Sequence, residues 1–429
     1  MSTYEQITTI ITIEGIFITL LSSLRYYNSR CLLTLTILIM VKNILFTGSN
    51  PFIPQHGGVE RVTDSLCKEL LKRGFNVFYL CKNTLTAKDY IYPCPISFLP
   101  NKDFVNSIVN LEFYHDFLRK NNIDIVINQD GLHEGAHLFC NRSEMNVKII
   151  SVIHNNPITN YNHLFFELFR KKNNSFEETL RRYIRIALYP EVKYRIRKGM
   201  KKHYEFLFKN SDQIVILAPS YFPLLKKINK GFIKKTCAIY NPNTYEEQQT
   251  VPPKENRVLY VGRLHKQKRI ERLLYIWKSI SNGFPDWYLD IVGDGEERAF
   301  LQNICLLNNI RSVTFWGNQD PKRFYQKCSI ICIVSDFEGF PMVLTEAMQY
   351  GCVPISFDSF EAIHDIIIPH TTGEIIKPFK KKKYALTLKN LMQDIQYREY
   401  LSRNAFKQVK KFDIKPIVNK WELLFRSLE

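Results

Sequence analysis

The sequence predicts an α/β protein made of two doubly wound domains, and three observations support this fold class. The chain has 429 residues, and at roughly 100–200 residues per domain this length favours two domains. Short apolar segments alternate with longer stretches of helical periodicity, which is typical of parallel sheets covered by helices on both faces. The alternation is interrupted once, between residues 241 and 256, so the elements form two series.

The first series gives the N-terminal domain, residues 40–240. A helix should follow its first strand, because Val59, Val62, Leu66 and Leu70 recur at spacings of three and four, and Gly74 ends the pattern. The strands expected in this domain are Asn43–Thr47, Asn76–Cys81, Asp124–Asn128, Lys148–Ile153 and Gln213–Leu217.

The interruption at residues 241–256 is interpreted as a linker, because it contains Asn241-Pro-Asn243, a polar run and Pro252-Pro253. A C-terminal domain, residues 257–405, follows, and residues 406–429 should form a helix that crosses back to the first domain. Ligands of such folds bind beyond the carboxyl ends of the strands, so we expect the two domains to face each other across a binding cleft. The strands expected in the second domain are Arg257–Val261, Trp287–Val292, Ser312–Trp316, Ser329–Ser335 and Val353–Phe357.

The first 39 residues are expected to be an extension outside the fold. Their apolar runs, Gly15–Leu24 and Cys31–Val41, are each shorter than the roughly 20 residues that span a bilayer. The segment from Met40 to Ser49 reads like the start of a domain, and we hypothesise that the native protein begins at Met40. The alternative is a short membrane-associating hairpin.

The charge of the chain is concentrated in one region. The net charge is +18, and residues 165–235 hold 18 Lys or Arg against six Asp or Glu. Such a local excess indicates an anionic partner: a lipid surface, an acceptor or nucleic acid. The alternative is a solvated face, which is also our interpretation of Lys380–Lys383. The ten cysteines form no CxxC pair and no zinc spacing, which favours reduced, buried thiols in a cytosolic protein.

Three motifs carry candidate chemistry, and the first is Gly57-Gly58 at the start of the first helix. Glycines at a helix start expose backbone N–H groups, an arrangement that binds phosphate, although glycines also simply begin helices.

The second motif is Arg263 and Lys268, directly after the first strand of the second domain. A guanidinium and an ammonium group suit a diphosphate, and the alternative is a solvated basic loop.

The third motif runs from Glu338 to Gly351. Pro341 should be the first residue of a helix and Gly351 its end, which puts Glu338 on a loop and Glu346 inside the helix. Pro341 and Glu346 are roughly 7–8 Å apart along such a helix, so the two carboxylates could hold two separate hydroxyl-bearing rings. Glu346 lies among Val343, Leu344, Ala347 and Met348, where an idle carboxylate would be costly.

These motifs, in this order and spacing, resemble the retaining glycosyltransferases of family four, which have the GT-B fold of two Rossmann-like domains. The resemblance covers residues 43 to the C-terminus, and its signature is a Glu, seven residues and a second Glu, which Glu338 and Glu346 match. It implies that Arg263 and Lys268 neutralise the donor diphosphate, that Glu338 binds the donor sugar and that Glu346 binds the nucleotide ribose.

The same resemblance implies the rest of the donor site. The Gly57 and Gly58 amides would approach the diphosphate, Phe315-Trp316-Gly317 would lie near the base, and His154 would lie near the sugar. The alternative for His154 is structural, since Asn155-Asn156-Pro157 marks an ordinary turn. The remaining donor-binding residues are Gly339, Phe340, Pro341, Met342, Val343 and Leu344.

The resemblance predicts a retaining transfer of a hexose or N-acetylhexosamine from a nucleotide sugar, UDP-linked, to a glycan or lipid-linked acceptor. The expected setting is a surface polysaccharide such as capsule or lipopolysaccharide, on the inner face of the cytoplasmic membrane with peripheral attachment to anionic lipid. No metal or other cofactor is expected, because the chain has no Asp-x-Asp pair of the metal-dependent transferases and two cations could replace a divalent ion.

Three other classes of protein are weighed against this one. One is an enzyme of another class on the same fold: an epimerase, which would act without an acceptor, or a phosphorylase, which would need a cofactor-bearing lysine. A nucleic-acid-binding protein is suggested only by the charge, and no recognition motif supports it. A catalytically dead scaffold is disfavoured by the intact Arg263, Lys268, Glu338 and Glu346.

Overall fold

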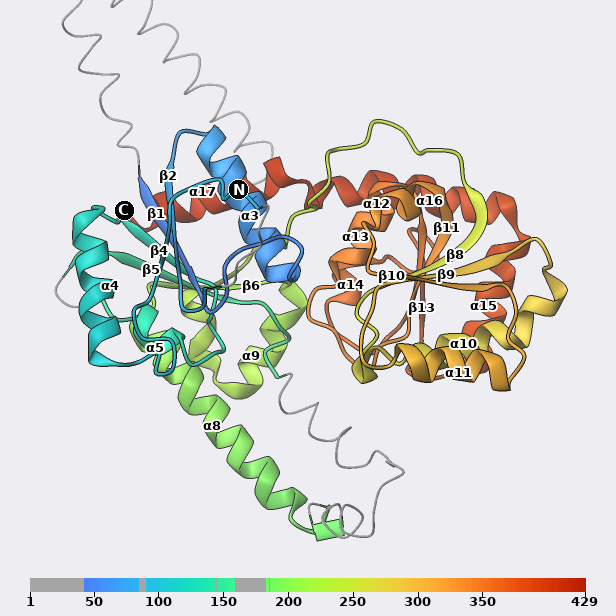
Figure 1. The fold of residues 1–429 in the computed structure, drawn as a ribbon, viewed down its shortest axis with the longest axis horizontal. Coiled ribbons are helices and arrows are strands. Elements are labelled where there is room, and N and C mark those ends of the chain that lie inside the picture. The colour runs from blue at the N-terminus through green and yellow to red at the C-terminus, as the bar shows by residue number, and fades with distance from the viewer. Residues whose placement is uncertain (1–41, 85–89, 143–144, 159–182, 185) are drawn as a thin grey trace, which may run out of the picture. The chain divides into compact units, whose positions relative to one another are not determined.

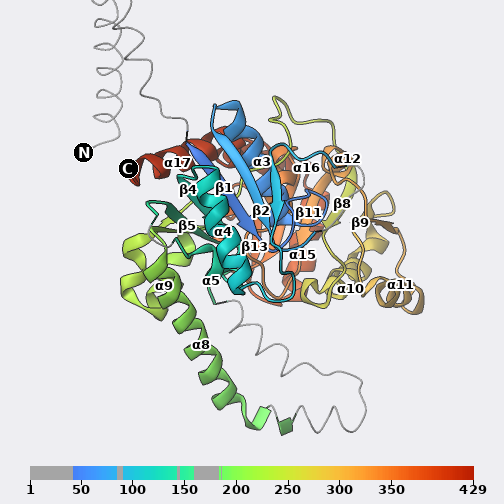
Figure 2. The same cartoon turned by 60° about the vertical axis from the view of Figure 1, so that its left-hand side comes forward.

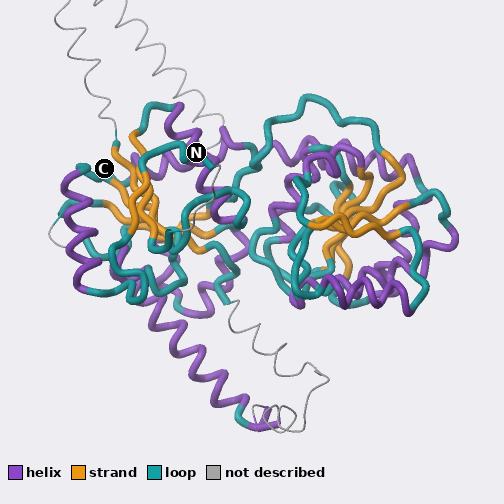
Figure 3. Tube along the Cα trace, in the orientation of Figure 1, coloured by secondary structure: helices purple, strands orange, loops and turns teal. Residues whose placement is uncertain are grey.

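The chain folds around two parallel β-sheets in a computed structural model that describes residues 42–84, 90–142, 145–158, 183–184 and 186–429. The expected extension, residues 1–39, and part of the basic region, residues 165–182 and 185, lie outside the described residues. Figures 1 and 3 show the two groups of strands, each with helices on both faces.

The first sheet has seven strands in the order β3-β2-β1-β4-β5-β6-β7, all parallel. Its central strands are almost continuously apolar because both faces are covered, as in β5, whose last five residues are buried. The strands are β1 Asn43–Gly48, β2 Asn76–Cys81, β3 Ile96–Phe98, β4 Ile125–Asn128, β5 Lys148–Ile153, β6 Gln213–Ile216 and β7 Thr236–Ala238.

The helices of the first sheet begin with α3, which follows β1 as the apolar spacing predicts. It ends just before Gly74, whose φ of 88° is the left-handed conformation that glycine adopts without strain. The helices are α3 Gly58–Lys72, α4 Ile108–Lys120, α5 Ala136–Phe139, α8 Tyr189–Asn210 and α9 Phe222–Ile228, with 3₁₀ turns η1 Pro219–Tyr221 and η2 Lys230–Lys235.

The second sheet has six parallel strands in the order β10-β9-β8-β11-β12-β13. Its strands are β8 Glu255–Val261, β9 Tyr288–Val292, β10 Val313–Gly317, β11 Cys328–Ile333, β12 Val353–Phe357 and β13 Glu374–Ile376. Its helices are α10 Ile270–Ile280, α11 Arg298–Leu307, α12 Lys322–Lys327, α13 Met342–Gln349, α14 Ile363–Ile366, α15 Lys381–Gln393 and α16 Ile395–Gln408. The 3₁₀ turns are η3 Lys266–Lys268, η4 Ser281–Gly283 and η5 Val409–Phe412.

The ten predicted strands are all present, with ends shifted by a residue or two, and three short strands were missed. The missed strands β3, β7 and β13 have three residues each, too few for the sequence pattern to reveal a period. Glu255 and Asn256, which we assigned to the linker, belong to β8. Pro341 was expected inside the helix, but α13 begins at Met342 because Pro341 has a non-helical ψ of 90°.

The last helix, α17 Ile414–Ser427, leaves the second sheet and packs against α3 of the first (Figures 1 and 2). Arg73, just after α3, holds it through Asn419 at 2.6 Å and Glu422 at 3.1 Å. The rings of Phe75 and Phe425 meet edge to face with centroids 5.9 Å apart. The C-terminus is therefore part of the core of the first sheet.

The described cysteines are all free thiols, and seven of these nine are buried. This agrees with the expectation of reduced core thiols. Within the described ranges, we find no helix with the length and apolar character needed to cross a membrane.

Candidate functional site

An ion pair between Lys268 and Glu338 lies at the carboxyl ends of two adjacent strands of the second sheet. Lys268 closes the 3₁₀ turn after β8, and Glu338 lies on the loop between β11 and α13. The Lys268 Nζ atom is 2.8 Å from both oxygens of Glu338, and Ser335 Oγ donates to Glu338 Oε1 at 2.6 Å. Glu338 is only 7% exposed, so this carboxylate is buried and its charge is compensated.

Arg263 follows the same strand as Lys268, and its side chain is exposed. Within the described part of the chain, its guanidinium makes no hydrogen bond or ion pair. Gly262 before it has a φ of 149°, a conformation that favours glycine and turns the chain out of β8. The Arg263 guanidinium is therefore available to bind an anionic ligand from solution.

Glu346 is fully buried inside α13, at 0% exposure. Its Oε1 accepts from Thr244 Oγ1 at 2.8 Å and its Oε2 from Tyr325 OH at 3.2 Å. Arg61 Nη2, from helix α3 of the first sheet, is 3.2 Å from Oε1. Burial lowers the pKa of Arg61, but the charge of Glu346, together with Tyr325, Tyr245 and Asp320, outweighs burial, and the pKa is raised overall.

The segment from Gly339 to Leu344, which comprises the loop Gly339–Pro341 and the first turn of α13, contacts the first sheet. Tyr221 OH donates to Gly339 O at 2.6 Å, and an added Cβ at Gly339 would meet His154 O at 2.8 Å. Phe340 packs against Tyr240 with ring centroids 5.7 Å apart. Among the predicted donor-binding residues of this segment, the side chains of Phe340, Pro341, Met342 and Leu344 are buried and that of Val343 is partly exposed.

Gly57 and Gly58 lie where α3 begins, as predicted. Gly57 has extended backbone and precedes the helix, and neither residue receives a side-chain cap. An ideal Cβ at Gly58 would lie 3.8 Å from the Met342 sulfur, so the start of α3 lies beside the first residue of α13. The first-turn amides of a helix favour anions, so the start of α3 is a candidate contact for the diphosphate.

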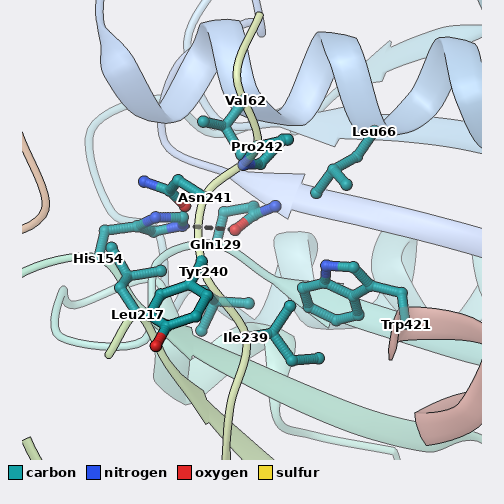
Figure 4. Close-up of a pocket in the computed structure, with 11 residues that line it drawn as sticks. Val62, Leu66, Gln129, His154, Leu217, Ile239, Tyr240, Asn241, Pro242 and Trp421 are labelled. Atoms are coloured by element: carbon teal, nitrogen blue, oxygen red, sulfur yellow. Dashed lines mark hydrogen bonds between the residues drawn. The ribbon is translucent and has the colours of Figure 1, made fainter. Parts of the chain in front are cut away.

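His154 follows β5 and is held by Gln129, which follows the neighbouring strand β4. His154 Nε2 and Gln129 Oε1 are 2.5 Å apart. Figure 4 shows both side chains at a small cavity that is also lined by Tyr240, Asn241 and Trp421. Burial, and to a smaller extent His133, lowers the pKa of His154 to about 3, so the imidazole is neutral at physiological pH.

Trp316 and Gly317 end the edge strand β10. The indole Nε1 donates to Asp290 Oδ1 at 2.8 Å, and the ring is 39% exposed. Gly317 has a φ of 71° and accepts a hydrogen bond from Gly293 N at 2.7 Å. The structure ties Trp316 to β9, and its place beside a base stays a prediction.

Several residues around these groups escaped the sequence analysis: Arg61, Gln129, Thr244, Tyr325 and Ser335. Arg61 and Ser335 lie within or beside the motifs, at Gly57-Gly-Val-Glu-Arg61 and Ser335-Asp-Phe-Glu338, and this closeness was a usable signal. Gln129, Thr244 and Tyr325 lie far along the chain from the groups they contact, so only the fold brings them there. In the described ranges no three His, Cys, Asp or Glu side chains could hold a metal ion.

Two family profiles match the chain, one over each half. The profile described as Glycosyltransferase Family 4 matches residues 56–203, and that described as Glycosyl transferases group 1 matches residues 242–408. The first match begins beside Gly57, and the second contains Arg263, Lys268, Glu338 and Glu346.

Similar proteins are also named as glycosyltransferases. An uncharacterized glycosyltransferase of Haemophilus influenzae is 24% identical over 376 residues, 85% of this chain and 95% of that protein. A Campylobacter jejuni α-1,4-N-acetyl-D-galactosaminyltransferase, named for an undecaprenol-linked glycan, is 27% identical over 203 residues, 46% of this chain and 56% of that protein.

Solved structures share the fold. The lipopolysaccharide outer core galactosyltransferase WaaB superposes with a TM-score of 0.65 at 20% identity, over 90% of this chain and 99% of that one. Anabaena Alr3699/HepE in complex with UDP superposes with a TM-score of 0.69 at 14% identity, over 90% of this chain and all of that one. With both halves matched by family profiles and the two parallel sheets on the GT-B plan, the chain belongs to the family-four glycosyltransferases.

Proposed function

We propose that this glycosyltransferase transfers a hexose or N-acetylhexosamine from a UDP-sugar, with retention of anomeric configuration, to a glycan or lipid-linked acceptor. The observation that carries the donor assignment is the grouping of positive charge around Glu338. Lys268 contacts this buried carboxylate, Arg263 follows the same strand with no side-chain partner among the described residues, and the start of α3 lies beside the Met342 side chain of α13. A diphosphate is the kind of anion that these cationic side chains and helix-start amides would bind.

Glu338 is suited to bind sugar hydroxyls while it keeps its partners. A carboxylate offers about four acceptor positions, and Lys268 and Ser335 occupy three of those of Glu338. A hydroxyl of the donor sugar would take a remaining position and would share the Lys268 ammonium. The same ammonium would then contact both the sugar-binding carboxylate and the diphosphate.

Glu346 is proposed to bind the ribose after a change of partners. Thr244 and Tyr325 each donate to one oxygen of its carboxylate, and Arg61 Nη2 contacts both oxygens. All four acceptor positions are therefore taken, and ribose hydroxyls would replace at least one of these donors. Tyr325 is buried, whereas Thr244 and Arg61 are partly exposed, the Arg61 side chain at 25%, so ribose would displace one of these two.

In the transfer, the anomeric carbon would lose its bond to the diphosphate and gain a bond to the acceptor on the same face of the sugar. The bond from the anomeric carbon to the diphosphate oxygen breaks, and the bond from that carbon to the acceptor oxygen forms on the side that the nucleotide leaves. The acceptor proton passes to the departing phosphate oxygen. Arg263, Lys268 and the backbone amides would stabilise the charge that develops on the diphosphate, each by a few kcal/mol.

The acceptor and the setting are proposed from the relatives and from the charge. The Campylobacter relative is named for an undecaprenol-linked glycan and WaaB for the lipopolysaccharide outer core, which favours a surface polysaccharide. Helix α8 carries seven Lys or Arg against two Glu, which suits peripheral contact with anionic lipid on the inner face of the cytoplasmic membrane. No metal is proposed to take part.

The experiment is a panel of UDP-, GDP- and ADP-sugars, read first by thermal shift and then by nucleotide release with candidate acceptors. A UDP-hexose or UDP-N-acetylhexosamine should raise Tm and release UDP, and proton NMR of the product should give the anomeric configuration of the donor. An inverted product would contradict retention. Stabilisation by GDP- or ADP-sugars alone would contradict the UDP assignment, and turnover without any acceptor would favour an epimerase.

A further inference from the structure

Gln129 is a buried residue that no motif includes and that the transfer mechanism above does not use. It lies directly beyond β4, is 5% exposed, and its backbone N–H donates to Thr47 O at 2.9 Å. Its position is therefore fixed by the β1–β4 pairing at the carboxyl edge of the first sheet. A buried amide needs hydrogen-bond partners, and the partner of its oxygen is His154.

The contact with His154 comes from the pairing of two neighbouring strands. Strands β4 and β5 are parallel, with Asn128 opposite Ser151, so the residues that follow them leave the sheet side by side. Gln129 Oε1 and His154 Nε2 are 2.5 Å apart, and Figure 4 shows the two side chains directed at each other. An amide oxygen only accepts, so the imidazole proton must lie on Nε2.

The other nitrogen of the ring is left as an acceptor without a donor. The His154 imidazole is neutral, because burial and His133 lower its pKa to about 3, and a neutral ring carries one proton. The Nδ1 atom is inaccessible to solvent and makes no hydrogen bond within the described residues. A buried acceptor without a partner costs about 1–3 kcal/mol, which a ligand hydroxyl would recover on moving the side chains that cover Nδ1.

The backbone of His154 lies beside the segment that carries Glu338. The carbonyl of His154 lies 2.8 Å from the Cβ position of Gly339, and Gly339 is the residue after Glu338. The residue that we assign to the sugar and the unpaired nitrogen therefore belong to neighbouring segments.

We propose that Gln129 is a positioning residue, which fixes the Nε2–H tautomer of His154 so that Nδ1 accepts a hydrogen bond from a hydroxyl of the donor sugar. The part that concerns the sugar rests on the proposed function. A neutral amide suits this task better than a carboxylate would, because a carboxylate stabilises the doubly protonated imidazolium, in which both nitrogens donate.

The test compares three substitutions in the full chain. Gln129→Met keeps the volume and removes the acceptor, Gln129→Glu keeps an acceptor at the same reach, and Gln408→Met is the matched control. Gln408 is a partly buried residue at the end of α16, on a different segment of the chain from Gln129 and His154. The tautomer is read from ¹⁵N NMR of histidine-labelled protein, with His154→Ala to assign the signal.

In the wild type, the His154 signal should be that of an Nε2–H tautomer with an unprotonated Nδ1. Gln129→Met should populate the Nδ1–H form, Gln129→Glu should keep the proton on Nε2 at pH 8, and Gln408→Met should leave the signal unchanged. A wild-type tautomer in Gln129→Met would overturn the proposal. Should Gln129→Met not fold, Gln129→Asn, whose oxygen is withdrawn by one methylene, makes the same prediction.

Kinetics separate positioning from general packing. Gln129→Met should lower kcat/KM for the UDP-sugar about tenfold, the loss of one hydrogen bond. In a His154→Ala background the same change should have almost no further effect. Equal losses in both backgrounds would contradict the proposal. The affinity for UDP, which has no sugar, should not change, and failure of the wild type to bind UDP would instead refute the proposed function.

Discussion

Glu346 illustrates how a residue assigned to a ligand can also hold the fold. Its carboxylate has no exposed surface, and three protein donors compensate it. Its apolar neighbours in the sequence indicated that this carboxylate has a functional or structural role. In the structure it forms an ion pair that links α13 to Arg61 of α3. Ribose binding and this ion pair therefore compete for one group.

At the residue scale, Glu346→Gln should destabilise the protein. Removing one charge of a buried pair leaves the other uncompensated, which costs about 3–5 kcal/mol. The measurement is Tm and the urea midpoint, compared with Glu399→Gln, whose side chain is 62% exposed and pairs with Arg403 at 3.6 Å. Equal stability of the two variants would show that Arg61 does not depend on Glu346.

At the element scale, the loop after Glu338 should tolerate no side chain at Gly339. An added Cβ would lie 2.8 Å from His154 O, a backbone atom that cannot move aside cheaply. Gly339→Ala should therefore weaken donor binding by about tenfold or more, on the scale of overpacking costs. Gly283→Ala is the control, because an added Cβ there meets nothing within 4 Å. Titration with UDP-sugar measures both, and matching affinities would refute the close approach.

The start of α17 should give the stability a pH dependence. Burial, and then the charge of Glu247, raise the pKa of Asp413 to about 6, although a hydrogen bond from Asn243 and the charge of Lys410 oppose the shift. Between about pH 4 and pH 6 the folded state then holds a proton that the unfolded state has lost, so the free energy of unfolding falls as the pH rises.

Asp413→Asn removes that titration, so its Tm should fall less between pH 4 and pH 6.5 than the Tm of the wild type. Thermal unfolding in matched buffers measures the difference, and Asp116→Asn, on an exposed side chain, controls for the loss of one carboxyl. Parallel Tm profiles for Asp413→Asn and the wild type would contradict the role of Asp413.

The sequence predicted long elements well and short ones poorly, for a physical reason. Strands β5 and β11 have six residues each and are mostly apolar, so their composition alone predicts a buried strand. Strand β13 has three residues and depends on its pairing with β12. The site followed the same rule, because Lys268 and Glu338 belong to local motifs, whereas Gln129 reaches His154 only through the order of β4 and β5.

At the scale of the whole molecule, positive charge is expected to direct the protein to a surface. Helix α8 extends from the first sheet in both views of Figures 1 and 2, and of its residues only Tyr204 and Leu207 are buried. Its cations Lys198, Lys201 and Lys202 are exposed. At about 1 kcal/mol per cation near an anionic membrane, these three should contribute roughly a hundredfold in vesicle affinity.

Replacing Lys198, Lys201 and Lys202 with Gln should reduce binding to anionic vesicles by that factor and leave binding to neutral vesicles unchanged. The same change at Lys381, Lys382 and Lys383 of α15 removes equal charge from another helix and should have little effect. Cosedimentation measures both triple variants. Equal losses would assign the effect to net charge, and no loss in either would contradict membrane contact through α8.

The central claim is that a nucleotide sugar is cleaved beside the Lys268–Glu338 pair, and UDP release by matched lysine variants tests it most directly. Lys268→Ala should lower kcat by about a hundredfold, because the charge on the leaving diphosphate loses its ammonium partner. Lys278→Ala, at an exposed position of α10 where Nζ contacts Asn308 at 3.3 Å, should keep wild-type turnover. Near-normal UDP release by a folded Lys268→Ala protein would contradict the account.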